Sequence, residues 1–286
     1  MKKVFKYPKH IYNAIIDYDF SGRSAEMGFM LVLGIFPFML FLVAVFGWLG
    51  HKTFMNSVLL FLSNIMPIDA MNLIRTVLRE VMIFSKGGLM GAIGFVVTLF
   101  LTSNAVAVVL KGLNTAYQVE ETRSFLYTRV LSLIMVFVNT LVLFLSINLV
   151  IFGKLIVNFL TSYFGITHAI ALTFLTLRWP IAFLALYVMA FINYYILPDL
   201  KGEESLKRKS ALPGTLFFCI FWLAGSWGFS IYVNNLHTYN RVYGTIGAFA
   251  MLMMWLYYSS MLLLIGGEMN SRVYNKLERS KNNEQK

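Results

Sequence analysis

Four charged residues stand at the ends of strongly apolar segments, where the sequence otherwise carries few charges: Glu26, Lys111, Arg123 and Glu268. Two acids and two bases at one depth can form ion pairs that hold helix ends together. Pairs that break and re-form can instead gate a pathway or bind a lipid headgroup. Structural pairing is the commoner use, but the sequence leaves both uses open for these four residues.

Inside the apolar segments the most polar side chains are amides, at Asn104, Asn139, Asn148 and Asn193. An amide in a membrane helix can bond across to a neighbouring helix or line a polar pathway, and packing is the more frequent role. Pro37 lies in the middle of the first apolar segment. Because proline lacks an N–H and clashes with the preceding turn, we expect a helix hinge there.

The residue types needed for catalysis or metal binding are scattered. No H-x-x-x-H, C-x-x-C or phosphate-loop motif occurs, and the D-x-D pair, Asp17 and Asp19, would point to different faces of a helix. The four histidines lie far from one another, at His10, His51, His168 and His237. The sequence therefore predicts no catalytic residues, no metal site and no cofactor, and the protein is not expected to be an enzyme.

Six long apolar runs must position these residues. Each approaches or exceeds the ~20 residues that a helix needs to cross a hydrocarbon layer ~30 Å thick. They cover residues 29–50, 89–110, 130–152, 179–197, 212–233 and 244–265. The predicted fold class is all-α, a polytopic membrane bundle of six transmembrane helices. We divide the chain into an N-terminal tail (1–26), a transmembrane domain (27–270) and a C-terminal tail (271–286).

The basic residues are distributed unevenly about these runs. If the six runs alternate across a membrane, seventeen of the 24 Lys and Arg fall on the side of the two termini. The other seven are Lys52, Arg75, Arg79, Lys86, Lys154, Arg178 and Arg241. The positive-inside rule then predicts a multi-pass protein of the cell membrane with both termini in the cytoplasm. Attraction to anionic lipids accounts for the net charge of +11, so membrane lipids, and not nucleic acid, are the expected partners.

Two shorter segments are amphipathic. Residues 8–20 carry apolar side chains at helical spacing and are expected to form a short helix at the cytoplasmic surface. Residues 51–87 contain two apolar stripes separated by Pro67, which predicts a pair of amphipathic helices between the first two spans. That pair could lie flat on the membrane or re-enter it, and the sequence does not choose between these arrangements.

Several motifs are similar to those of the YihY/BrkB family of bacterial inner-membrane proteins. They include Gly34-Ile35-Phe36-Pro37, Gly91-Ala92-Ile93-Gly94, Leu110-Lys111-Gly112-Leu113-Asn114-Thr115-Ala116-Tyr117, Glu121-Thr122-Arg123-Ser124-Phe125, Leu197-Pro198-Asp199, Leu212-Pro213-Gly214, Tyr243-Gly244-Thr245-Ile246-Gly247-Ala248, Trp255-Leu256-Tyr257 and Gly266-Gly267-Glu268-Met269-Asn270. The resemblance implies a six-span protein of the cytoplasmic membrane. Members have carried a ribonuclease BN label, an activity that belongs to an unrelated soluble zinc hydrolase, and some carry a virulence-factor label.

Three functions compete at this stage. The first is a permease or lipid-flipping protein for an amphiphilic or envelope-related substrate. The second is an envelope scaffold that does not transport and that recruits partners through its tails. The third and least favoured is a tRNA-processing ribonuclease. A homo-oligomer or envelope proteins are the candidate protein partners.

Overall fold

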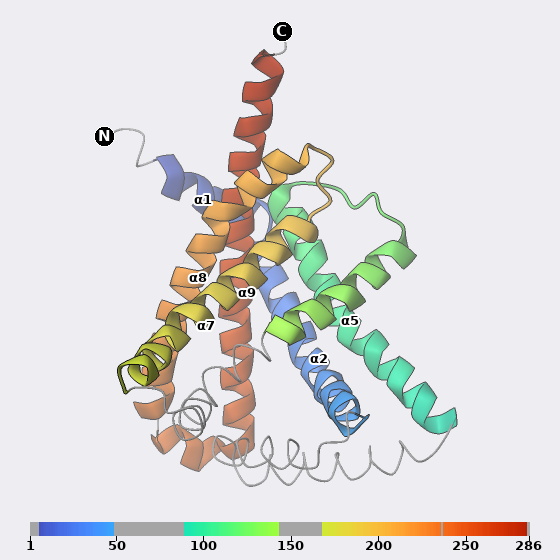
Figure 1. Cartoon of the computed structure of the whole chain (residues 1–286), viewed down its shortest axis with the longest axis vertical. Helices are drawn as coiled ribbons and strands as arrows, with labels where there is room; N and C mark the ends of the chain where they lie inside the picture. The colour runs from blue at the N-terminus through green and yellow to red at the C-terminus, as the bar shows by residue number, and fades with distance from the viewer. Residues whose placement is uncertain (1–5, 49–88, 143–167, 236, 285–286) are drawn as a thin grey trace.

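The computed structural model describes residues 6–48, 89–142, 168–235 and 237–284 (Figure 1). Within these ranges the chain forms seven helices and no strand, which confirms the all-α fold class. The helices are α1 (Lys6–Asp17), α2 (Phe20–Trp48), α5 (Leu89–Tyr117), the helix Phe125–Val142, α7 (His168–Ile196), α8 (Glu204–Asn235) and α9 (His237–Glu284).

Four of the described helices are long and apolar enough to cross a membrane. The qualifying stretches are Leu99–Tyr117, Phe125–Val142, Glu204–Tyr232 and Phe249–Asn283. A shorter apolar stretch, Pro180–Ile196, lies within α7. Many large apolar side chains on these helices point outward, as expected where lipid is the solvent. The end of the predicted third span and the whole 51–87 segment lie outside the described residues, so the count of six spans remains a prediction.

The helices extend further than the apolar runs that predict them. We expected a span to begin at residue 179, yet α7 begins at His168 and continues through Pro180. A proline disfavours helix in the residue before it without forbidding it, and apolar backbone in a membrane satisfies its own hydrogen bonds best as a helix. The 48 residues of α9 correspond to about 72 Å, far more than one crossing requires.

The predicted surface helix of residues 8–20 is present as α1, with slightly different ends. It stops at Asp17, and Asp19 follows with a φ of 47°. The Asp19 carboxylate then accepts a hydrogen bond from the backbone N–H of Gly22 at 3.1 Å. This is the N-cap arrangement of a helix start, and it explains why α2 begins at Phe20.

The bundle is organised around α9, which packs against α8, α2 and α5 (Figure 1). A close approach joins α9 to α8, where a Cβ on Gly214 would overlap the Gly266 carbonyl oxygen. Glycine at this crossing lets two helix backbones touch, as small residues do in membrane bundles. Figure 1 shows α1 lying across the end of the bundle from which the C-terminal part of α9 extends.

Two clusters of buried residues form the core, and both lie toward the end of the bundle that carries α1. The smaller cluster joins Phe20 and Met27 of α2 to Ala116 and Leu264. The larger contains Leu110, Leu113, Tyr117, Met135, Ala190, Tyr194, Leu197, Leu200, Ala211, Phe218, Cys219, Leu262 and Tyr274. A packed core at this end provides a rigid frame for the polar groups described next.

Candidate functional site at one end of the bundle

A polar cluster joins two loops at the end of the bundle that carries α1. We call it the loop network; its residues are Asn114, Glu121, Thr122, Arg123 and Asp199. The two loops connect α5 to the helix Phe125–Val142 and α7 to α8. Every member of the network makes at least one hydrogen bond to another member, so the loops are held as one unit.

Arg123 is the cationic centre of this network. Its Nε donates to Glu121 Oε1 at 2.6 Å and its Nη2 donates to Glu121 Oε2 at 2.7 Å, a two-pronged pairing. The same Nη2 donates to the Leu197 carbonyl oxygen at 2.7 Å, which ties the first loop to the end of α7. The Arg123 side chain is 16% exposed, so water screens these contacts only in part.

Asp199 completes the connection from the second loop. Its Oδ2 accepts hydrogen bonds from the Thr122 N–H at 2.7 Å and from the Thr122 hydroxyl at 2.6 Å. Its backbone N–H donates to Asn114 Oδ1 at 2.9 Å, while Asn114 Nδ2 donates to Glu121 Oε2 at 2.7 Å. Asn114, near the end of α5, therefore forms hydrogen bonds with both loops.

The network favours the ionised form of both acids. Partial burial acts to raise the pKa of Glu121, but hydrogen bonds from Arg123 and Asn114 outweigh it and hold that pKa below its usual value. For Asp199 the same burial effect is overcome by the Thr122 hydrogen bonds and the charge of Arg123, which lower the pKa. Both carboxylates are consequently charged at neutral pH.

A third carboxylate, outside this network, is almost fully buried. Glu268 of α9 is 1% exposed, and it pairs with Arg272 one turn later, with an N–O distance of 2.6 Å. Gln118 Nε2, from the turn after α5, donates to Glu268 Oε2 at 3.3 Å. Arg272 also donates to the His10 carbonyl oxygen at 3.1 Å, so one buried acid connects α9 to α5 and, through its partner, to α1.

The α9 residues that contact α8 stand on either side of Glu268 in the sequence. The Gly214 N–H donates to Asn270 Oδ1 at 2.6 Å, in a position just after Pro213. Proline removes one N–H from the hydrogen-bond ladder of α8, and the next N–H along the chain bonds a side chain of α9. Tyr194 of α7 donates its hydroxyl hydrogen to the Leu263 carbonyl oxygen at 2.9 Å, which brings a third helix to the same crossing.

The structure distributes the four predicted charged residues among three ion-pair groups. Lys111 and Glu26 pair at 3.9 Å, with both side chains well exposed. Arg123 pairs with Glu121 and, at 3.8 Å, with Asp199. Glu268 pairs with Arg272. All four residues therefore take part in ion pairs, but only the first pair joins two of the predicted set.

Two of the predicted amides bond to each other. Asn193 Nδ2 donates to Asn139 Oδ1 at 2.9 Å, and Asn139 Nδ2 donates back to Asn193 Oδ1 at 3.2 Å. This reciprocal pair connects α7 to the helix Phe125–Val142, which is the packing role. Asn104 accepts a hydrogen bond from Arg129 at 2.7 Å. Asn148 lies outside the described residues.

The predicted hinge at Pro37 falls within α2, which is helical through that position. The hinge itself remains a prediction.

Sequence reasoning missed several residues of this site. Glu121 and Asp199 stand inside motifs that we had recognised, but their polar partners come from other parts of the chain. The Glu268–Arg272 pair was available from the sequence, because an acid and a base four residues apart share one helix face. Among the described residues, no group of three or more His, Cys, Asp or Glu is placed to hold a metal ion.

Comparison with known proteins identifies the family. The family model described as virulence factor BrkB matches residues 11–286, nearly the whole chain. This chain belongs to the BrkB family. It is 28% identical over 266 residues to the ribonuclease-like protein YfkH of Bacillus subtilis, covering 93% of this chain and 94% of that protein.

A second similarity is confined to one part of the chain. UPF0761 membrane proteins of Xanthomonas campestris and Xanthomonas oryzae are 32% and 31% identical over 94 residues. Each alignment covers 32% of this chain and 21% of the Xanthomonas protein, so the match spans about a fifth of those relatives. No solved structure matches this chain.

Proposed function

We propose that this BrkB-family membrane protein is a permease or lipid-flipping protein for an amphiphilic or envelope-related substrate. The observation that carries the proposal is the burial of Glu268, a carboxylate with 1% exposure in a helix apolar enough to span a membrane. A buried ionisable group in such a helix is costly, and it usually marks a substrate or ion pathway. Glu268 bonds Arg272 of its own helix and Gln118 from the turn after α5, and a change in helix packing would break the contact with Gln118.

The proposed gate uses the polar groups at this end of the bundle. Glu26, Lys111, Arg123 and Glu268 would open and close by exchanging partners. The contact from Gln118 to Glu268, at 3.3 Å, is the longest and weakest of the Glu268 bonds, and we expect it to break first. Because Gln118 and Arg123 share one loop, that movement would also strain the loop network. Pro37 would serve as the hinge and Asn104, Asn139, Asn148 and Asn193 as polar lining.

We further propose that this end of the bundle faces the cytoplasm, with both termini on that side of the cell membrane. Two observations support the shared side. Arg272 near the C-terminal end of α9 bonds the His10 carbonyl oxygen of α1, and the two helices meet at one end of the bundle (Figure 1). The excess of basic residues on the terminal side supports the cytoplasmic assignment.

Reconstituted vesicles test the transport proposal. The full chain would be inserted into vesicles carrying fluorescent phospholipids or labelled envelope precursors, and translocation would be followed by loss of accessible label. We expect translocation by the natural protein and a strong reduction in Glu268→Gln. Glu204→Gln is the matched control, because Glu204 is an exposed acid on α8 whose side chain is 64% accessible.

The outcomes separate the parts of this proposal. Folded protein that moves none of the tested substrate classes would contradict a transport function. Equal translocation by Glu268→Gln, Glu204→Gln and the natural chain would retain transport and remove the Glu268 gate.

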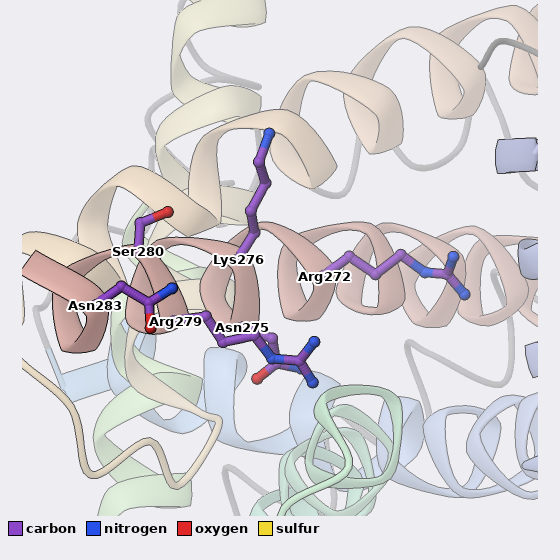
Figure 2. A pocket seen from close by; sticks show the side chains of 6 residues that line it. All are labelled: Arg272, Asn275, Lys276, Arg279, Ser280 and Asn283. Carbon is purple, nitrogen blue, oxygen red and sulfur yellow. The ribbon is translucent and has the colours of Figure 1, made fainter.

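The scaffold function is the second candidate, and the C-terminal part of α9 favours it. This part extends beyond the rest of the bundle (Figure 1), and a pocket lies along it. Figure 2 shows that the lining residues all come from α9: Arg272, Asn275, Lys276, Arg279, Ser280 and Asn283. A basic surface of this kind suits an acidic partner. Crosslinkers placed in residues 201–210 and 268–286 should capture stable partners if the scaffold role is correct.

The ribonuclease-like name of YfkH motivates a third, least favoured test. RNA cleavage by the purified chain that survives strong chelation and is lost on changing Asp17 or Asp19 would support it. The Asp19 carboxylate caps α2, so Asp19→Asn, which preserves a cap, is the appropriate variant.

A further inference from the structure

Arg129 lies in the second turn of the helix Phe125–Val142, within a stretch that is apolar enough to span a membrane. Its Nη1 donates to Asn104 Oδ1 at 2.7 Å and to Ser103 Oγ at 3.0 Å, both on α5. These acceptors fix the position of the guanidinium against the neighbouring helix. They are neutral, so they do not balance its charge.

Aromatic rings cover the guanidinium on two sides. Its central carbon lies 4.2 Å from the centroid of the Phe100 ring and 5.3 Å from that of Phe125. Cation–π contacts of this kind favour a positive charge without neutralising it. The Nε atom is buried and finds no hydrogen-bond partner among the described residues.

The missing component at this site is an acid. Arg123 and Arg272 are partly buried at the same end of the bundle, and each bonds a carboxylate at 2.6 Å. In the part of the chain that the structure describes, Arg129 has no carboxylate within ion-pair distance, and its Nη2 makes no hydrogen bond. A partly desolvated cation in an apolar setting requires an anion, and the fold holds Arg129 ready for one.

The surface beside Arg129 shows which kind of molecule would bring that anion. An exposed apolar strip runs along the outer face of the same helix, and each of its members is at least 48% exposed. The strip consists of Leu126, Val130, Ile134, Phe137 and Leu141. Their spacing of three or four residues places them on one face, as an acyl chain lying along the helix would require.

We propose that Arg129 binds the phosphate group of an anionic phospholipid whose acyl chain lies on this strip. Phosphate suits a guanidinium because its oxygens accept parallel hydrogen bonds from neighbouring N–H groups. The site goes beyond the proposed function, because lipid would bind here whether or not the protein moves it. Ser103 and Asn104 act as positioning residues that hold Arg129 toward the lipid.

Binding can be measured on the full chain in neutral detergent, where no transport contributes to the result. Phosphatidylglycerol would be titrated and the bound fraction read by native mass spectrometry, with phosphatidylcholine as the zwitterionic comparison. We expect Arg129→Gln to weaken phosphatidylglycerol binding about tenfold or more, as for the loss of a charge-assisted hydrogen-bonded pair. Arg129→Lys should retain part of the affinity.

The control is Lys209→Gln, which removes a positive charge from an exposed side chain on α8. It should change binding less than twofold. Equal losses in Lys209→Gln and Arg129→Gln would overturn the site, because they would indicate attraction to overall positive charge. Displacement of the lipid from the natural chain by millimolar inorganic phosphate would overturn the lipid assignment in favour of a free anion.

A second measurement keeps the proposal testable if Arg129→Gln does not fold. Phosphatidylglycerol carrying a photoreactive group near its phosphate would be crosslinked to the natural protein. We expect the adducts within residues 99–104 or 125–134. Adducts confined to other segments would overturn the proposal.

Discussion

Arg123 should couple energetically to Glu121 far more strongly than to any other acid at this end of the bundle. A double-mutant cycle measures this coupling, with Arg123→Gln and Glu121→Gln as the single changes. The side chain of Arg123 makes two charge-assisted hydrogen bonds to Glu121, at 2.6 and 2.7 Å. Its contact with Asp199 is a 3.8 Å ion pair.

The geometry sets the expected magnitudes. Each hydrogen bond to a charged group contributes roughly 1.5–3 kcal/mol, but bonds within one pair are not additive, and Glu121 keeps its bond from Asn114 when Arg123 is removed. We therefore expect a coupling free energy of about 2 kcal/mol for Arg123 with Glu121. The longer contact with Asp199 should give about 1 kcal/mol or less. Arg123 with Glu268, which bonds Arg272 and Gln118 in the described part of the chain, should give no more than about 0.5 kcal/mol.

The assay is reversible denaturation of the full chain in mixed micelles, with each single and double variant measured under one condition. Helical content by circular dichroism confirms that the variants begin from the same folded state. A coupling below about 0.5 kcal/mol for Arg123 with Glu121 would refute the reasoning. A larger coupling of Arg123 with Glu268 than with Glu121 would also refute it. That result would restore the expected pairing among the four charged residues at the helix ends.

Three further outcomes test the packing and the ionisation by the same denaturation assay. Gly214→Ala should cost about 2 kcal/mol or more, because its Cβ would overlap the Gly266 carbonyl oxygen. Gly228→Ala in the same helix meets nothing within 4 Å among the described residues and should be neutral or stabilising by up to about 1 kcal/mol. The lowered pKa values of the two loop-network acids add stability at neutral pH that is lost as the pH falls below about 4.5; replacing both acids by amides should flatten this dependence. Asn139→Leu should cost about 1 kcal/mol by leaving Asn193 Oδ1 without its hydrogen-bond donor, and adding Asn193→Leu should recover part of the loss; equal costs for the single and double variants would contradict this pairing.

Fold class and membrane character could be predicted from the sequence because they depend on local composition. A run of about 20 apolar residues has one stable form in hydrocarbon, since a helix satisfies its own backbone hydrogen bonds. The short surface helix was predictable for a similar reason, because its apolar residues recur at helical spacing. The ends of α7 and α9 were not predicted well, because α7 begins in an apolar stretch before Pro180 and α9 continues past its apolar run into polar residues.

The partners of the charged residues were decided only by tertiary structure. The sequence placed Arg123 and Glu268 at one boundary, but the conformation of the loop from α5 turns Arg123 toward Glu121 and Asp199 instead. Likewise, the α8–α9 crossing at Gly214 joins residues 56 apart in the chain. Apolar burial is a property of each segment alone, whereas an ion pair depends on the positions of two segments at once, and only the folded bundle specifies both.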